Sequence, residues 1–384
     1  MNFARDRRAQ LVAAFGQHWG AQPEIWCRAP GRVDLMGSHT DYNLGLVLTL
    51  PIDRDTWIAA RPRADRAVRL FSLNLDARST FDLDQLTPAP GRAWCNYVRG
   101  VASVLQAEGL ALRGLDAVIH STVPVGGGLS SSAALECAVA TLFEALGGWR
   151  LDPVRKALLC QRAENAFVGV NCGILDQFTS CAGQEGCALL LDCRDLSCQP
   201  VQLAENLQIV ICDTRSQRQL AASAYAQRRA QCENGARQLN ASSLREISLD
   251  QFRHREAELP PEVARRCRFI LEENERVRHL AAALATGDPP RIRRFCAESF
   301  AGAMHLYEIG TPVMQAMMDA MLAAPGVLGA RQAGAGFGGC MVAVVDPPRL
   351  EAFSAAVREH YYGSTGTRAE VYPVRAAAGA GRMD

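Results

Sequence analysis

Apolar and polar positions alternate with a period of two in several short segments of the first 125 residues. Such alternation predicts β-strands with one buried face. The strand-like segments are 47–52, 56–62, 67–73, 79–84 and 116–124. We expect a charged helix at the start of the chain, over residues 1–15, and an irregular segment near Trp26 that contains Gly31-Arg32-Val33.

The pattern changes in the second part of the chain. Two strand-like runs, 186–196 and 207–214, precede a stretch from about 217 to 325 in which helical periodicity dominates. Strands at 341–346 and 369–374 follow, with a helix from Pro348 between them, and we expect 376–384 to be a frayed tail. A chain of 384 residues is long enough for two domains with substantial cores. We expect the boundary near 195–205.

Composition and charge narrow the class of partner. Hydrophobic residues make up 48% of the chain and charged residues 21%, which is typical of a globular protein. Lys and Arg total 41 against 40 Asp and Glu, and no long run of like charge occurs. This balance indicates neither nucleic acid nor a membrane surface, so we expect a small-molecule partner.

The 14 cysteines are scattered from Cys27 to Cys340, many of them inside apolar runs. The first residues lack the apolar region of a signal peptide, and no Cys pair or Cys/His cluster has zinc-binding spacing. We therefore expect core thiols in a reducing cytoplasm rather than disulfides or a transition-metal site. No apolar stretch reaches the roughly 20 residues of a membrane span.

The most distinctive segment is VPVGGGLSSSAA at 123–134, which precedes a run of small and apolar residues that suits a buried helix. Glycines let the backbone approach a polyphosphate closely, and a helix that begins at the serines directs N–H groups and its positive dipole end at an anion. The same residues also suit an ordinary N-capped turn, and both interpretations stay open at this point. No P-loop pattern is present, and a Rossmann pattern through Gly126 and Gly128 lacks the acidic residue expected about 20 positions later.

Three further segments concentrate groups that bind or react. Residues 29–43 bring Arg32, His39, Asp41 and Asn43 into one glycine-bracketed loop, a density of donors and acceptors that suits a sugar. Asp176 stands in the otherwise apolar stretch NCGILDQF, and the second glycine-rich loop, GARQAGAGFGGC, spans 329–340. Taken singly, these segments also fit a solvated turn, a helix cap and a tight turn before a buried strand.

Together and in this order, the four segments resemble the galactokinase branch of the GHMP kinases. GRVDLMGSHTDYN is similar to the galactokinase signature and VPVGGGLSSSAA to the ATP motif of the superfamily. CGILDQF is similar to the segment with the catalytic Asp, and GAGFGGC to the C-terminal glycine motif. LAASAYAQRRAQCE is similar to a stretch that places a Tyr against the sugar. The resemblance covers almost the whole chain.

The resemblance implies an α+β fold of two domains with the active site in the cleft between them. Residues 1–200 would form an N-terminal α/β domain with a left-handed βαβ crossover, and residues 201–384 a C-terminal α+β domain. It also implies transfer of the ATP γ-phosphoryl group to the anomeric hydroxyl of a hexose. Asp176 would accept or orient the proton of that hydroxyl, and Arg32 would keep Asp176 ionised and stabilise charge on the phosphoryl group.

The other implied roles fall into three groups. The sugar would contact Arg32, Ser38, His39, Asp41, Gly173, Asp176 and Tyr225; the phosphates of ATP would contact Gly126, Gly127, Gly128, Leu129, Ser130, Ser131 and Ser132; Mg²⁺ would be held by Ser132 and Glu164. The implied partners are a small-molecule sugar and Mg-ATP, without nucleic acid or membrane, and the chain would be a monomer or a weak homodimer.

Two departures from the family pattern bear on the substrate. Galactokinases usually have Glu at the position of Ser38, where it contacts the C6 hydroxyl, and Ser38 leaves space and removes a negative charge, which favours tolerance of a uronic acid. Segment 299–315 lacks the polar run that is usual in galactokinases, and it has some likeness to galacturonate kinases. A polar side chain from this segment is one way to replace the Glu that is missing at Ser38. Galactose is the leading expected substrate. The alternatives are galacturonate, arabinose, and a non-catalytic regulator that binds galactose and ATP.

Overall fold

Two β-sheets with helices on their faces form the molecule, which a computed structural model describes over residues 3–91, 93–216 and 221–383. The larger sheet has eight strands in the order β12-β1-β2-β5-β3-β4, with β6 paired to β2 and β7 to β6. Its strands are β1 (Ile25–Met36), β2 (Leu46–Pro62), β3 (Ala67–Ser72), β4 (Ala77–Asp82), β5 (Leu115–Ser121), β6 (Cys187–Asp192), β7 (Cys198–Gln202) and β12 (Gly381–Met383).

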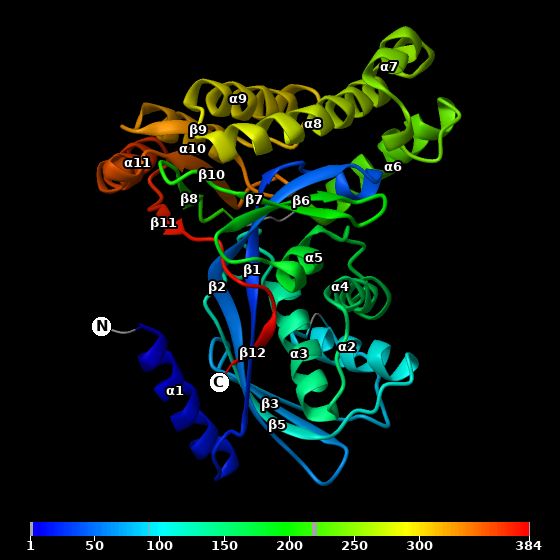
Figure 1. The fold of residues 1–384 in the computed structure, drawn as a ribbon, viewed down its shortest axis with the longest axis vertical. Helices are drawn as coiled ribbons and strands as arrows, with labels where there is room; N and C mark the ends of the chain where they lie inside the picture. Colours follow the sequence, from blue (N-terminus) through cyan, green and yellow to red (C-terminus); the bar gives the residue numbers. More distant parts are fainter. Residues whose placement is uncertain (1–2, 92, 217–220, 384) are drawn as a thin grey trace.

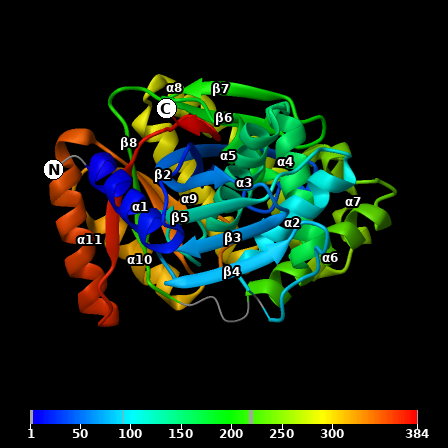
Figure 2. The ribbon, with the colours of Figure 1, turned by 90° about the horizontal axis from the view of Figure 1, so that it is seen from below.

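Helices cover both faces of the larger sheet. Figures 1 and 2 show α1 (Phe3–Trp19) on one side and the helices α2 to α5 on the other. These four are α2 (Cys95–Ala107), α3 (Ser131–Gly147), α4 (Pro153–Arg162) and α5 (Leu175–Ala182). α3 and α5 pack directly on β1 and β2, so the helix that follows the first glycine loop and the helix that contains Asp176 are both fixed to the same strands.

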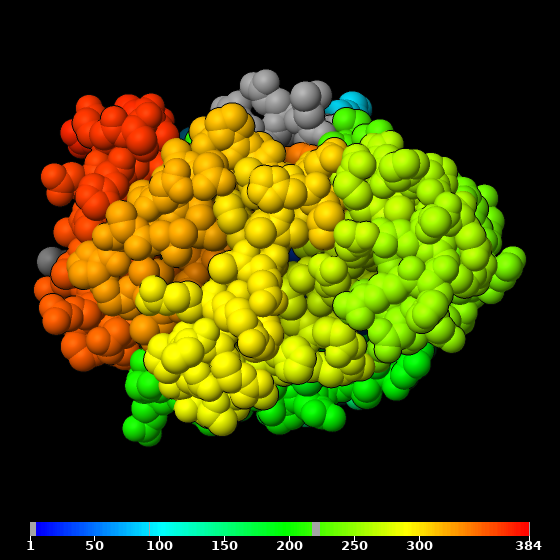
Figure 3. Space-filling model, turned by 90° about the horizontal axis from the view of Figure 1, so that it is seen from above, coloured from blue at the N-terminus to red at the C-terminus, as the bar shows by residue number. Residues whose placement is uncertain are grey.

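The smaller sheet has the order β11-β8-β10-β9. Its strands are β8 (Gln208–Asp213), β9 (Val327–Gln332), β10 (Cys340–Val345) and β11 (Glu370–Val374). The helices of this half are α6 (Ala221–Gln238), α7 (Leu249–Arg255), α8 (Pro261–Thr286), α9 (Pro289–His305), α10 (Pro312–Ala323) and α11 (Leu350–Thr365). Figure 3 shows α7, α8 and α9 forming the outer surface of this end of the molecule. None of the helices described is long and apolar enough to cross a membrane.

Alternation along β8 and β10 sends their side chains into two different cores. Ile209 and Ile211 pack in a cluster with α8 and with residues of β1 and β2, whereas Val210 and Cys212 pack with α10 and α11. The first of these clusters therefore contains side chains from both halves of the molecule. The change from one sheet to the other falls between β7 and β8.

Most predicted elements are present, but two expectations in the larger sheet, at β1 and β12, were wrong. The segment with Gly31-Arg32-Val33 is not irregular: it lies inside β1, which is paired to β2 with two register shifts that disturb the alternation. The expected frayed tail is ordered up to Met383, because β12 pairs with β1 at Trp26, Cys27 and Arg28. The predicted helical stretch from 217 begins with 217–220, which lie outside the described residues, as do 1–2 and 384 of the predicted terminal segments.

Candidate active site

A cavity lies where the loop after β1, the start of α5 and helix α6 meet. Its volume of about 600 Å³ is in the range of small-molecule sites. Its lining brings together eight residues that the sequence singled out. These are Arg32, Ser38, His39, Asp41, Glu164, Gly173, Asp176 and Tyr225. Residues from positions 32 to 335 contribute to the wall, so the site is assembled by the tertiary fold rather than by one segment.

Arg32 and Asp176 form the central ion pair of the cavity. The Arg32 Nε donates to Asp176 Oδ1 at 2.8 Å, and Nη2 donates to the same oxygen. The third guanidinium nitrogen, Nη1, donates to the carbonyl oxygen of Gly128 at 2.6 Å. One arginine therefore positions the carboxylate of α5 against the first glycine loop. Among the described residues, Asp176 Oδ2 accepts no hydrogen bond from the protein, and the side chain is 27% exposed.

The first glycine loop leads into α3, as the sequence predicted. Gly126 and Gly128 have positive φ angles of 76° and 82°, which L-residues rarely adopt, and Ser130 has a φ of 62°. The Ser130 hydroxyl is buried without a hydrogen-bond partner within the described part of the chain. Residues 126–132 do not line the cavity itself but adjoin it through Gly128 and Arg32. The geometry matches an anion cradle at a helix N-terminus next to the cavity.

The second glycine loop lies against the first. The backbone N–H of Cys340 donates to the carbonyl oxygen of Gly127 at 3.0 Å. A Cβ on Gly334 would make an ordinary contact of 3.4 Å with the carbonyl oxygen of Gly128, but the φ of Gly334 is 78°. Both loops thus contain backbone in the left-handed region, which favours glycine.

An aromatic wall closes the cavity around His39. Its Nε2 lies 2.9 Å from the carbonyl oxygen of Ala335, and its Nδ1 lies 2.7 Å from the Tyr42 hydroxyl. Burial lowers the pKa of His39 to about 4, so the ring is neutral, and since a carbonyl only accepts, Nε2 donates and Nδ1 accepts from Tyr42. Both ring nitrogens are thus engaged within the protein. The ring of Tyr225 lies 5.2 Å from that of His39 between centroids and completes the wall.

Asp41 and Gly173 lie in direct contact at another wall. A Cβ added to Gly173 would collide with Asp41 Oδ2, so this position has room only for glycine. Burial, with Asp176 as a secondary cause, raises the pKa of Asp41 to about 6. The site therefore places a poorly solvated acceptor near the Asp176 carboxylate.

Glu164 lies in the six-residue π-helix Ala163–Val168 and faces α3. Burial and the nearby Asp176 raise its pKa to about 7, while hydrogen bonds from Cys172, Ser132 and Gln177 oppose the shift. Gln177 Nε2 donates to both Glu164 Oε2, at 2.6 Å, and Glu136 Oε2, at 3.0 Å, and Glu136 Oε1 has no hydrogen-bond partner within the described ranges. The carboxyl groups of Glu164 and Glu136 therefore meet at the Gln177 amide.

A divalent cation fits that donor set. Mg²⁺ prefers oxygen ligands and is usually held by one or two carboxylates together with water and substrate phosphates. Ser132 and Glu164 supply a hydroxyl and a carboxylate next to the phosphate cradle. Across the described ranges, no cluster of three or more His, Cys, Asp or Glu side chains could hold a metal without such additional ligands.

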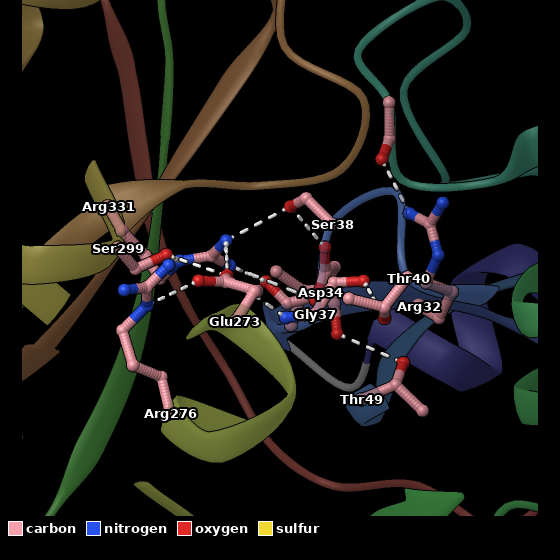
Figure 4. Close-up of polar contacts among 12 residues, drawn as sticks. Arg32, Asp34, Gly37, Ser38, Thr40, Thr49, Glu273, Arg276, Ser299 and Arg331 are labelled. Carbon is pink, nitrogen blue, oxygen red and sulfur yellow. Dashed lines mark hydrogen bonds and ion pairs between the residues drawn. The ribbon is translucent and has the colours of Figure 1, made fainter. Parts of the chain in front are cut away.

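Ser38 lies at the floor of the cavity, at the edge of a buried polar network (Figure 4). Its Oγ donates to Asp34 Oδ2 at 2.6 Å and accepts from Arg331 Nη2 at 3.0 Å. Arg331 also bonds Glu273 Oε1 at 3.2 Å and Ser299 Oγ at 3.1 Å. Two polar residues of segment 299–315 reach the surroundings of the cavity: Ser299 contacts Arg331, and Tyr307 contacts Tyr42, but neither lines the cavity.

Sequence reasoning missed Asp34, Glu273 and Arg331. Asp34 lies on the same strand face as Arg32, and this periodicity would have identified it if the segment had been interpreted as a strand. Glu273 on α8 and Arg331 on β9 are more than 230 residues from Asp34 in sequence, and no local pattern indicates that they meet it.

Family models match three parts of the chain. The model for the GHMP kinases N terminal domain matches residues 96–184, the model for the galactokinase galactose-binding signature matches 13–62, and the model for GHMP kinases C terminal matches 280–363. A galactokinase of Roseiflexus sp. (strain RS-1) is 43% identical over 379 residues, which are 97% of each chain. A galactokinase of Chloroflexus aurantiacus is also 43% identical, over 97% of this chain and 96% of its own.

Solved structures of a galactokinase and of a more distant kinase are also similar to this chain. The galactokinase of Lactococcus lactis, crystallised with galactose, superposes with a TM-score of 0.93 at 32% identity, covering 98% of this chain and 99% of that one. The mevalonate kinase of Methanococcus jannaschii has a TM-score of 0.66 at 14% identity over 92% of this chain, which shows a shared fold only.

Proposed function

Because this chain belongs to the galactokinase family of the GHMP kinases, we propose that it transfers the γ-phosphoryl group of ATP to the anomeric hydroxyl of galactose. The products are galactose 1-phosphate and ADP. The observation that supports this most directly is the Arg32 guanidinium, which contacts Asp176 with two nitrogens and the glycine loop with the third.

Asp176 acts on the sugar hydroxyl in this proposal. The two Arg32 nitrogens that contact Asp176, Nε and Nη2, both donate to Oδ1, so Oδ2 remains able to accept the hydrogen of the C1 hydroxyl. An anomeric hydroxyl is more acidic than an ordinary alcohol, and a carboxylate paired with a guanidinium is placed here to orient or accept its proton. Arg32 also lies between the hydroxyl and the phosphate cradle, where positive charge stabilises the phosphoryl group in transfer.

The glycine loop and its neighbours position ATP. Backbone N–H groups of residues 126–131 and the positive end of α3 are suited to the phosphates. Ser132 and Glu164 would hold Mg²⁺, which neutralises phosphate charge and orients the phosphoryl group when bound. His39, Asp41, Gly173 and Tyr225 also line the cavity, where the sugar ring would lie against aromatic faces and the Asp41 carboxyl.

The proposal includes a cytoplasmic setting and a monomer or weak homodimer. Eleven of the 14 cysteines are buried and all are free thiols, so they pack as small core side chains that suit a reducing compartment. Sedimentation over a range of concentrations tests the oligomeric state.

The function is tested by ADP release from Mg-ATP with galactose, galacturonate, arabinose, N-acetylgalactosamine and glucose as acceptors. We expect galactose to have the highest kcat/KM. Asp176→Asn should lower kcat about 10²- to 10⁴-fold, because the amide cannot accept the proton of the sugar hydroxyl as a carboxylate can. Asp319→Asn, on α10 and away from the cavity, is the control. Equal turnover in wild type and Asp176→Asn would contradict the role of Asp176, and ADP release with none of the sugars would contradict the kinase and favour the non-catalytic regulator.

A further inference from the structure

Asp34 lines the cavity from the same strand face as Arg32. The two residues pair with Thr49 and Pro51 of β2, and no register shift falls between them, so their side chains point to the same side of the sheet. Two residues along a strand are about 6.7 Å apart. Arg32 and Asp34 therefore offer two separate contact points in the same cavity, Arg32 next to Asp176 and Asp34 next to Ser38.

The two carboxyl oxygens of Asp34 differ in their bonding. Oδ2 accepts the Ser38 hydroxyl at 2.6 Å. Oδ1 is buried without a hydrogen-bond partner within the described ranges, and its nearest cation, Arg331 Nη1, lies 3.8 Å away. Asp34 is only 1% exposed, and a buried carboxyl oxygen without a hydrogen bond is rare in native proteins. An acceptor in this state on a cavity wall indicates a donor that arrives with the ligand.

The neighbouring polar groups are already engaged with one another (Figure 4). Ser38 uses its hydrogen on Asp34 and a lone pair on Arg331. Glu273 Oε1 accepts from Ser299 at 2.7 Å and from the Gly37 backbone at 3.3 Å, and its Oε2 accepts from Arg276 at 2.7 Å. Ser38 therefore positions Asp34 instead of acting as the main acceptor for the sugar.

We propose that Asp34 Oδ1 accepts a hydrogen bond from a galactose hydroxyl at the end of the sugar remote from C1, and that this contact determines substrate specificity. This inference rests on the proposed function. It also changes the interpretation of Ser38: the carboxyl group that is absent at position 38 is present four residues earlier, on Asp34, which Ser38 contacts directly. A uronic acid would bring its carboxylate against another carboxyl group, so the enlarged space at Ser38 does not by itself favour galacturonate.

The test compares kcat/KM for galactose and its 2-deoxy, 4-deoxy and 6-deoxy analogues in wild type, Asp34→Ala and Asp34→Asn. Thr49→Val, which changes the buried residue opposite Asp34 on β2 without altering the cavity wall, is the control. Thermal midpoints and the KM for ATP show whether each variant is folded and binds nucleotide.

We expect Asp34→Ala to lower kcat/KM for galactose about 10- to 100-fold, the range of a hydrogen bond to a charged group. The loss should be equally large with 2-deoxygalactose, since C2 adjoins C1, but should fall to less than about threefold with either the 4-deoxy or the 6-deoxy sugar. Asp34→Asn keeps an acceptor oxygen and should show the same pattern with a smaller loss of kcat/KM. The comparison can therefore be made with Asp34→Asn if Asp34→Ala does not fold.

Failure of the Asp34 contact can be distinguished from failure of the kinase function. If the wild type turns over galactose but the Asp34 variants lose the same factor with all four sugars, or lose nothing, the contact is overturned and the kinase function is not. If the wild type does not turn over galactose, both the function and the inference are overturned.

Discussion

At the scale of single residues, Gly173 offers the sharpest steric test of the sugar wall. Gly173→Ala should raise the KM for galactose at least tenfold, because the new methyl group displaces the Asp41 carboxyl, while the KM for ATP should stay within about twofold. Steady-state kinetics with each substrate varied in turn measures both values. Gly363→Ala is the matched control, since a Cβ there meets nothing within 4 Å. Equal changes in the two KM values would contradict a local role at the sugar.

Asp41 gives the protein a specific pH dependence of stability. Its pKa is raised to about 6 in the folded state, mainly by burial, against about 3.9 when unfolded. The folded state thus binds the proton more tightly, so this contribution to stability is fully present below about pH 4 and is lost as the pH rises through 6. Asp41→Asn lacks the effect.

Urea denaturation of the wild type and of Asp41→Asn, each at pH 5 and pH 7.5, measures this pH dependence of stability. The wild type should lose about 1.4 kcal/mol of unfolding free energy relative to Asp41→Asn between these two conditions. Other carboxyl groups titrate in both proteins and cancel. Parallel pH profiles would show that Asp41 has an ordinary pKa in the folded protein.

The sequence predicted which residues enter the site better than it predicted how they act. His39, Asp41, Gly173 and Tyr225 were expected at the cavity and line it. The use of both His39 nitrogens by Ala335 and Tyr42 could not be foreseen, because Ala335 is 296 residues away and its carbonyl is placed by the second glycine loop. A motif identifies a cluster, but the donor and acceptor assignments depend on partners from other segments.

At the scale of elements, Arg331 connects β9 to β1 and α8. It contacts Asp34, Ser38, Glu273 and Ser299, and burial would raise the pKa of Glu273, but Arg276 and Arg331 outweigh it and keep that pKa below its ordinary range. The two arginines therefore compensate the buried charge of Glu273, whereas burial outweighs Arg331 at Asp34 and raises the pKa of that carboxyl group. Removal of Arg331 leaves the Glu273 carboxylate buried and incompletely compensated.

Arg331→Met, which keeps most of the side-chain volume, should therefore lower the free energy of unfolding by about 3 to 5 kcal/mol. Arg278→Met is the control on α8, where the side chain is 44% exposed and its pair with Glu275 contributes less than about 0.5 kcal/mol. Chemical denaturation at pH 7 measures both. A change below about 1 kcal/mol in Arg331→Met would show that the network is not needed for stability.

Elements with regular periodicity were predictable, and those set by tertiary pairing were not. The short apolar run at 341–345, rich in Val, predicted a strand that is present as β10. In β1, register shifts at Pro30/Arg32 and Asp34/Met36 break the period of two, so the pattern indicated an irregular segment. The last residues are small and have no periodicity, and they are ordered because Gly379 and Ala380 donate to the carbonyl oxygens of Gly183 and Ser180 at the end of α5.

At the scale of the whole molecule, the two sheets share one hydrophobic cluster. Its members come from β1 and β2 of the larger sheet, from β8 and β10 of the smaller one, and from α8; examples are Val33, Leu35, Leu48, Leu50, Ile209, Ile211, Val342, Val344, Val277 and Leu280. Polar contacts follow the same route, since Leu46 N donates to Asn274 Oδ1 of α8 at 2.7 Å. The cavity lies beside this shared core, so its walls cannot separate without exposing apolar surface.

The shared core predicts cooperative unfolding in spite of the two sheets. Differential scanning calorimetry should show one transition, because separation of the halves would expose the common cluster and cost about 25 cal/mol for each Å² of apolar surface. Leu280→Ala, at 1% exposure in this cluster, should lower the unfolding free energy by about 2 to 5 kcal/mol and shift that single transition as a whole. Leu322→Ala, at 54% exposure on α10, should change it by less than about 0.5 kcal/mol. If Leu280→Ala instead splits the endotherm and only one part moves, the halves unfold independently, and the geometry that brings Asp176 to the glycine loop is then stabilised by the larger sheet alone.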